Sequence, residues 1–233
     1  MTSNTTALQK LARIVLWICI PPLLLLSPLY VLATPAFVRY EYGKAGFPPS
    51  TVYDPDERLR LADASVYYLR SNAGPDYLWE LSSQGQEVYN PREVKHMVDV
   101  KVVMSAAFRV HAVCAVLALL AAVFLWTRPG GRHTVLRTVY QGCAALLIGM
   151  VAIGVLAYTS FDWFFVLFHR LFFQGDTWLF AYSDTLIQLF PVQFWMDATA
   201  GMAVLAIAAG VLLGGVAYAL SRSVGGIASL RSQ

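Results

Sequence analysis

Charged residues are scarce in this sequence: 13% of the residues are charged, whereas 58% are hydrophobic. Ordinary soluble domains are about a quarter charged, so this composition excludes one. The net charge of +3 gives no sign of a nucleic-acid-binding surface, and no nucleic-acid partner is expected. The long apolar runs that replace the missing charges predict an integral membrane protein instead.

Cysteines and the common catalytic motifs are also few or absent. The three cysteines, Cys19, Cys114 and Cys143, all lie in apolar runs, so the polar segments have no disulfide framework. There is no HExxH motif, no paired cysteine and no GxSxG nucleophile motif. The sequence therefore predicts no metal, no cofactor and no serine nucleophile.

Acidic residues are missing from the N-terminus, from the 127–137 turn and from the C-terminal tail. All 14 acids lie within 38–101 or 159–198. The acid-free segments carry the basic residues Lys10, Arg13, Arg128, Arg132, Arg137, Arg222 and Arg231. The positive-inside rule then places both termini in the cytoplasm and both acidic segments outside it.

Four apolar runs exceed the roughly 20 residues that a membrane-spanning helix needs. The predicted spans are about 12–37, 102–126, 135–158 and 199–220. The prolines of the first run should kink it, and a cleaved signal peptide is the alternative interpretation of that run. Small residues predict close helix packing in the third and fourth spans, namely Gly142, Gly149, Gly210 and Gly214.

The two polar segments also carry helix signals. Asp54-Pro55-Asp56-Glu57 places a capping residue, a proline and an acid at the start of a helix, and Asn90-Pro91 opens another that runs into the second span. We therefore expect an all-α membrane protein, with residues 1–233 forming a single membrane domain. It would have four transmembrane helices and a small, mainly helical extracytoplasmic cap made from 38–101 and 159–198.

The first candidate site lies just before the second span. Glu93, His96 and Asp99 are three residues apart, so they share one side of a helix. A carboxylate beside an imidazole can fix its tautomer and raise its basicity. The alternative is a solvated, charge-paired helix end.

The second candidate site lies in the aromatic stretch 161–198, whose rings are typical of the membrane–water interface. His169 and Arg170 sit among these rings, with Asp176 and Asp184 nearby. The simpler alternatives are an interfacial histidine, an anchoring arginine, a turn at Asp176 and a helix cap at Asp184.

Arg109 is predicted to lie inside the second span. A charge near the middle of a bilayer costs on the order of 3 kcal/mol, so it should have a partner or line a wet cavity. Asp162 and Asp99 are candidate partners, and a structural interhelical pair is the alternative to a functional role.

Both segments resemble a known family. The pattern Glu-x-x-His-Met-x-Asp-Val-Lys at 93–101 and the block FHRLFFQGDTWLFAYSDTLIQLFPVQFW at 168–195 are similar to signatures of the lipoprotein intramolecular transacylases, which are bacterial four-span membrane proteins. Tyr68-Leu69, upstream of both motifs, also fits the family resemblance. The resemblance covers nearly the whole chain.

The resemblance implies an enzyme of the bacterial cell membrane whose active site lies at the outer leaflet. It would move the sn-2 acyl chain of a diacylglyceryl-modified lipoprotein to the α-amino group of its N-terminal cysteine. The implied catalytic residues are His96 and His169. The expected supporting residues are Glu93, Asp99, Asp176 and Asp184, and the expected substrate-binding residues are Arg109, Arg170, Trp178 and Trp195. The partners would be such lipoproteins and membrane lipids.

Two other functions stay open at the level of sequence. One is a membrane module without enzymatic activity that senses or scaffolds envelope lipoproteins. The other is a metal-dependent lipid hydrolase with ligands drawn from Glu93, His96, Asp99 and His169.

Overall fold

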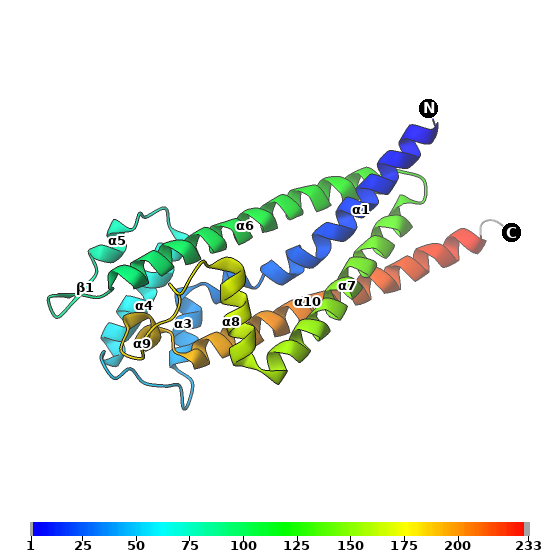
Figure 1. The fold of residues 1–233 in the computed structure, drawn as a ribbon. Helices are drawn as coiled ribbons and strands as arrows, with labels where there is room; N and C mark the ends of the chain where they lie inside the picture. The colour runs from blue at the N-terminus through cyan, green and yellow to red at the C-terminus, as the bar shows by residue number, and fades with distance from the viewer. Residues whose placement is uncertain (1, 231–233) are drawn as a thin grey trace. The chain divides into compact units, whose positions relative to one another are not determined.

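The computed structural model describes the backbone of residues 2–230 and the side chains of residues 6–155 and 159–224. Helices dominate the chain, and one short hairpin interrupts them (Figure 1). Within residues 2–230, four stretches are long and apolar enough to cross a membrane: Thr6–Leu32, Pro91–Trp126, Gly131–Val155 and Val192–Val224. This confirms the predicted all-α class with four spanning helices.

The chain forms two compact units. Unit 1 comprises Met1–Pro28, Phe108–Val155 and Ala203–Gln233, and unit 2 comprises Leu29–Ala107 and Leu156–Met202. Three long helices contribute to both units, namely α6 (Pro91–Trp126), α7 (Gly131–Thr159) and α10 (Val192–Leu230).

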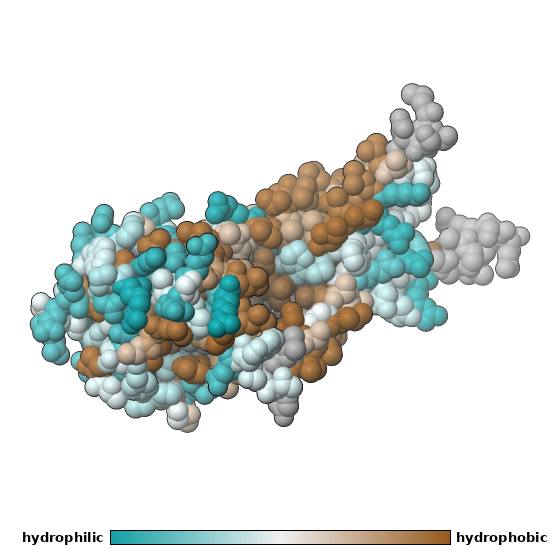
Figure 2. Space-filling model, viewed as in Figure 1, coloured by the Kyte–Doolittle hydropathy of each residue, from teal (hydrophilic) through white to brown (hydrophobic). Residues whose placement is uncertain are grey.

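Unit 1 contains α1 (Thr2–Leu26), most of α7 (Gly131–Thr159) and the later parts of α6 and α10. Its core joins α1, α6 and α7 through Leu16, Cys19, Ile20, Ala118, Ala121, Leu125, Val135 and Cys143. Hydrophobic residues cover much of the face of these helices in Figure 2, whereas hydrophilic residues gather at the helix ends beside the grey termini. This distribution suits helices that are surrounded by lipid.

Two of the four expected small residues allow helices of unit 1 to approach closely. A Cβ atom on Gly142 would lie 2.7 Å from Cβ of Ile20, and one on Gly214 would lie 2.9 Å from Cβ of Cys143. A Cβ on Gly210 would make ordinary contacts at 3.4 Å. The prediction is wrong for Gly149, because a Cβ there would meet nothing within 4 Å.

The first apolar run is divided into shorter helices. Instead of continuing to residue 37, α1 ends at Leu26, and α2 (Leu29–Leu32) and α3 (Pro35–Tyr42) follow. Pro28 has no backbone N–H to continue α1. Thr34 then accepts a hydrogen bond from the backbone N–H of Phe37 and caps α3, which begins with a proline.

Unit 2 contains the predicted helix α4 (Pro55–Arg70), with Asp54 as its N-cap. The Asp54 carboxylate accepts hydrogen bonds from the backbone N–H groups of Asp56 and Glu57, as the sequence predicts. α5 (Asp76–Trp79) and a hairpin of β1 (Ser82–Ser83) and β2 (Gln86–Glu87) follow. The predicted continuous helix from Pro91 into the second span is confirmed as α6.

The short helix α9 (Thr185–Leu189) is fastened to unit 2 by buried polar groups. Arg58 of α4 donates hydrogen bonds to the carbonyl oxygens of Gln188 and Pro48, both at 2.8 Å. The Gln188 side chain accepts from Ser50 and Thr51 and donates to the carbonyl of Tyr182. These bonds fix the segment that follows the aromatic loop.

Candidate active site

His169 lies on the inner side of α8 (Phe161–Phe172), which forms the first part of the aromatic stretch. Ser160 caps this helix by accepting a hydrogen bond from the backbone N–H of Trp163. Trp163 and Leu171 are exposed, whereas His169 is only 9% exposed. The amphipathic pattern of α8 therefore places an apolar face outward and an imidazole inward.

A hydrogen bond within α8 fixes the tautomer of His169. Its Nδ1 atom lies 2.8 Å from the carbonyl oxygen of Phe165. A carbonyl oxygen can only accept, so Nδ1 must carry a hydrogen and donate it. In the neutral ring, Nε2 is then the nitrogen that keeps a lone pair and can act as a base.

Burial also favours the neutral form of the His169 imidazole. Removal of the ring from water lowers the pKa of His169 below the ordinary value, and the hydrogen bond to Phe165 offsets only part of this effect. His169 is therefore neutral, with Nε2 unprotonated, at neutral pH.

His96 lies in the second turn of α6. Asn90 begins this helix: its side-chain oxygen accepts from the backbone N–H groups of Arg92 and Glu93, and the Glu93 carboxylate accepts from the N–H of Asn90. The ring of His96 is 9% exposed. Its Nδ1 atom is buried and has no hydrogen-bond partner among the described residues.

The two imidazoles face each other within unit 2. Their ring centroids are 6.2 Å apart and their planes differ by 18°. Phe173 borders both rings, at 5.0 Å from His96 and 5.4 Å from His169. Trp178 lies 4.8 Å from His169 and Phe180 lies 5.3 Å from His96. Two ionisable rings thus share one aromatic enclosure.

The structure does not show the carboxylates expected to orient His96 in that role, because Glu93 binds other groups and Asp99 makes no described hydrogen bond to the ring. Glu93 is buried, and its two oxygens accept hydrogen bonds from the backbone N–H groups of Asn90, at 2.9 Å, and of Leu186 in α9, at 2.7 Å. Asp99 is half-buried, and no hydrogen bond joins it to His96 among the described residues. Glu93 therefore holds the start of α6 to α9 instead of fixing the ring.

Asp184 and Asp176, the expected supporting carboxylates that follow later in the chain, likewise make no described hydrogen bond to either histidine. Asp184 precedes α9, but its side chain makes no capping bond to that helix. It pairs with Arg92 at 3.0 Å and accepts a hydrogen bond from the backbone N–H of Ala181 at 2.7 Å. Asp176 is exposed in the turn after Gly175. The Asp184 carboxylate therefore holds the aromatic loop from outside the pair of rings.

Among the expected substrate-binding residues, the described structure shows Trp178 in contact with a histidine. Trp178 is buried against His169 and donates its indole N–H to the carbonyl of Gly175. Arg170 is exposed on α8, and Trp195 packs on Phe190 and Phe194. Arg109 is exposed and belongs to unit 1, whereas the histidines belong to unit 2.

Several residues of the site escape sequence reasoning. The Phe165 carbonyl and the Phe173 and Phe180 rings could be anticipated only as part of an aromatic-rich stretch. Arg58 and Gln188 gave no signal, because charged and amide side chains in an amphipathic helix are usually solvated. Among the described side chains, of residues 6–155 and 159–224, no three of the His, Cys, Asp or Glu types gather closely enough to hold a metal ion.

Known proteins resemble this chain in both sequence and fold. A family model described as "Lipoprotein intramolecular transacylase Lit" matches residues 13–195. A protein of Aquifex aeolicus, described as uncharacterized, is 31% identical over 208 residues, which are 88% of this chain and 93% of that protein.

Solved structures of membrane-integral Lit from Bacillus cereus, in forms with a histidine replaced by arginine or by alanine, share the fold. Each has a TM-score of 0.66 and 21% sequence identity to this chain. The alignments cover 100% of this chain and 98% or 99% of those chains.

Proposed function

The chain belongs to the lipoprotein intramolecular transacylase family, and we propose that His96 and His169 carry out its acyl transfer. The protein is a multi-pass membrane acyltransferase that acts on lipoproteins. The observation behind our assignment of the histidines is their convergence: two buried imidazoles, from segments far apart in the sequence, lie 6.2 Å apart.

The proposed reaction moves one acyl chain within one substrate molecule. The α-amino nitrogen of the S-diacylglyceryl cysteine attacks the carbonyl carbon of the sn-2 ester. A C–N bond forms, the bond to the glycerol oxygen breaks, and that oxygen takes up a proton. No water is consumed and no acyl-enzyme is needed, which fits the absence of an evident nucleophile in the sequence. Correct positioning can supply roughly 7–11 kcal/mol of the required barrier reduction.

His169 is the proposed base. Its Nδ1 hydrogen is used by Phe165, so Nε2 is available for the proton that the amine loses. An α-amino group titrates near pH 7.7–8. Because the pKa of His169 is lowered, the amine should lose its proton to Nε2 while it attacks the ester and not before. The aromatic enclosure supports this role because it keeps the imidazole neutral before substrate binds.

His96 is the proposed second proton carrier. Its buried Nδ1 atom has no hydrogen-bond partner among the described residues, so the hydrogen-bonding capacity of that nitrogen is not used by the protein. A hydrogen on either nitrogen of His96 can stabilise the tetrahedral oxyanion or pass to the departing glycerol oxygen. The proton that His169 accepts must then pass to His96 to replace the one that His96 delivers, so that both imidazoles are neutral again at the end of the cycle.

The surroundings of the pair suit a lipid substrate. The exposed apolar side chains of α8, such as Leu171, can lie against membrane lipids, and Arg170 can anchor this helix at the headgroups. Trp178 would pack against the lipid moiety beside His169. Arg109 and Trp195 remain proposed substrate contacts, each to be tested by its alanine variant.

The charge pattern supports an outer-leaflet location for this site. Every acidic side chain belongs to unit 2, and the segments of unit 1 at the termini and the 127–137 turn carry only basic charges. Both termini would then be cytoplasmic, with the parts of 38–101 and 159–198 outside the spans forming an extracytoplasmic cap. A reporter that works only in the cytoplasm should be active when it is fused after Gln233, whereas a reporter that works only outside the cytoplasm should be inactive there.

The central test is the position of the acyl chain in a lipoprotein produced by the protein. A host that makes only diacyl lipoproteins should yield the lyso-form when it expresses the unaltered chain. Mass spectrometry must use fragment ions that locate the acyl chain, because substrate and product are isomers. His96→Ala and His169→Ala should each abolish the lyso-form while the protein stays in the membrane.

His133→Ala is the matched control, because His133 lies in the first turn of α7, in unit 1. It should leave the yield of lyso-form unchanged. Normal product from either active-site variant would remove that histidine from the mechanism. Retained lipoprotein binding without conversion in both variants would agree with catalytic roles, whereas unaltered protein that binds but never converts its substrate would favour a scaffolding module.

A further inference from the structure

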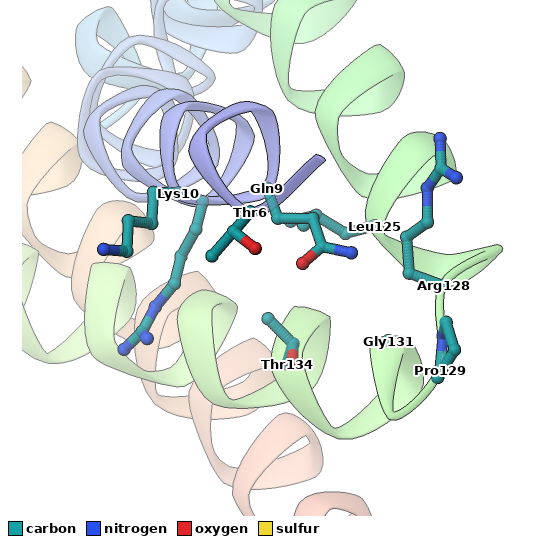
Figure 3. Close-up of a pocket in the computed structure, with 9 residues that line it drawn as sticks. Thr6, Gln9, Lys10, Leu125, Arg128, Pro129, Gly131 and Thr134 are labelled. Atoms are coloured by element: carbon teal, nitrogen blue, oxygen red, sulfur yellow. The ribbon is translucent and has the colours of Figure 1, made fainter. Parts of the chain in front are cut away.

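Unit 1 contains a cavity of about 180 Å³, lined by both polar and apolar groups, where the beginning of α1 meets the α6–α7 turn. Its walls are formed by Thr6, Gln9, Lys10, Arg13, Leu125, Arg128, Pro129, Gly131 and Thr134. In Figure 3, Gln9 of α1 and Thr134 of α7 face each other across the hollow, and Lys10 and Arg128 lie at its two sides. Neutral donors thus occupy the centre and cations its edges.

The charge around this cavity is of one sign. Lys10, Arg13 and Arg128 contribute three cations, and no acid lines the cavity. The sequence of unit 1 contains no Asp or Glu at all. The mutual repulsion of these cations therefore has no Asp or Glu side chain within the unit to offset it.

The described contacts of the two arginines are with neutral groups. Arg13 donates to the amide oxygen of Gln141 at 3.3 Å. The guanidinium of Arg128 lies 4.4 Å from the centre of the Phe124 ring. Its Nε atom is buried and has no hydrogen-bond partner among the described residues. An anion that reached this cavity would meet cations not yet paired with an acid.

We propose that this cavity binds the phosphate group of an anionic phospholipid. A single phosphate diester provides the negative charge and the acceptor oxygens that the arginines, Lys10, Gln9 and Thr134 can satisfy. A lipid is the favoured source because the cavity lies at the ends of spanning helices, where headgroups lie, and Leu8 and Leu11 on α1 are exposed beside it. The site is separate from the histidine pair and does not depend on its role.

The test measures lipid binding to the full-length protein in detergent by native mass spectrometry. Short-chain phosphatidylglycerol is titrated against the unaltered chain and against Lys10→Gln, Arg128→Gln and the double variant. Each removed cation should weaken binding about fivefold. Arg222→Gln is the matched control, because Arg222 is an exposed unit 1 arginine that does not line the cavity. It should bind as the unaltered chain does.

Parallel titrations with short-chain phosphatidylcholine and with inorganic phosphate identify the source of the anion. Phosphatidylcholine should bind at least tenfold more weakly than phosphatidylglycerol. Binding of inorganic phosphate alone would overturn the lipid as occupant, and equal losses in Arg222→Gln would show diffuse charge instead of a site. Should the double variant misfold, Lys10→Gln alone decides, because Lys10 is exposed and its loss disturbs no core contact.

Discussion

The Nδ1 atom of His169 donates a hydrogen bond to the carbonyl oxygen of Phe165, one helical turn earlier, at 2.8 Å. The bond relies on the backbone, so no conserved partner side chain is required to set the tautomer. The helix that carries the ring therefore also determines which nitrogen is free to accept a proton.

His169→Asn separates the structural and the proton-accepting roles of this ring. The Asn amide nitrogen can take the place of Nδ1 and keep the bond to the Phe165 carbonyl, but nothing replaces Nε2. We expect near-normal thermal stability together with at least a 100-fold loss of lyso-form production, since general-base catalysis contributes about 10²–10⁴-fold. Thermal unfolding in detergent and the fragment-ion assay provide the two measurements. Substantial activity in this variant would contradict the assignment of Nε2 as the base.

The buried imidazole of His169 should make stability depend on pH. Its pKa is lowered in the folded protein, so the folded state prefers the neutral ring. The resulting stabilisation is present above the ordinary value of 6.5 and is lost as the pH falls through the lower folded-state pKa. The unfolding temperature of the unaltered chain should thus fall more steeply between pH 7.5 and 5 than that of His169→Asn. Parallel curves would mean that His169 is not desolvated.

Glu93 should act as a positioning residue. Glu93→Ala would leave the backbone N–H groups of Asn90 and Leu186 without their acceptor, and each buried unsatisfied group costs about 1–3 kcal/mol. We expect a lower unfolding temperature and a lower kcat, with a smaller effect for Glu93→Gln, which keeps one acceptor oxygen. Glu87→Ala is the control, because Glu87 is exposed on β2 and should change neither quantity. An inactive but fully stable Glu93→Gln would point to a direct chemical role instead.

The glycines of α7 offer a paired test of packing in unit 1. Gly142→Ala would bring a methyl group to 2.7 Å from Cβ of Ile20, so we expect destabilisation of about 1–3 kcal/mol. Gly149→Ala meets nothing within 4 Å and should be neutral or stabilising by up to about 1 kcal/mol. Unfolding temperatures in one detergent provide the comparison. Equal effects at the two positions would contradict the close approach of α1 and α7 at Gly142.

Local signals in the sequence predicted local structure well. The Asp54 cap and the helix start at Asn90-Pro91 were both predictable, because capping depends on neighbours within one turn. The contacts of Glu93 were not predictable. Glu93 shares a helix side with His96, but its carboxylate bonds to Leu186, far away along the chain. Helical periodicity cannot reveal such a partner.

The sequence by itself determined that this chain is a four-span membrane protein with an asymmetric charge distribution. The bilayer sets the same requirements for every spanning helix: a minimum length, an apolar composition and charges outside the hydrocarbon layer. These requirements can be read directly from a sequence. Its motifs also indicated the family and both histidines. Only the tertiary structure decided how those histidines are used, because the enclosure of His96 and His169 depends on where α6, α8 and the loop before α9 pack. Long-range packing free energy sets that arrangement, and no local sequence pattern encodes it.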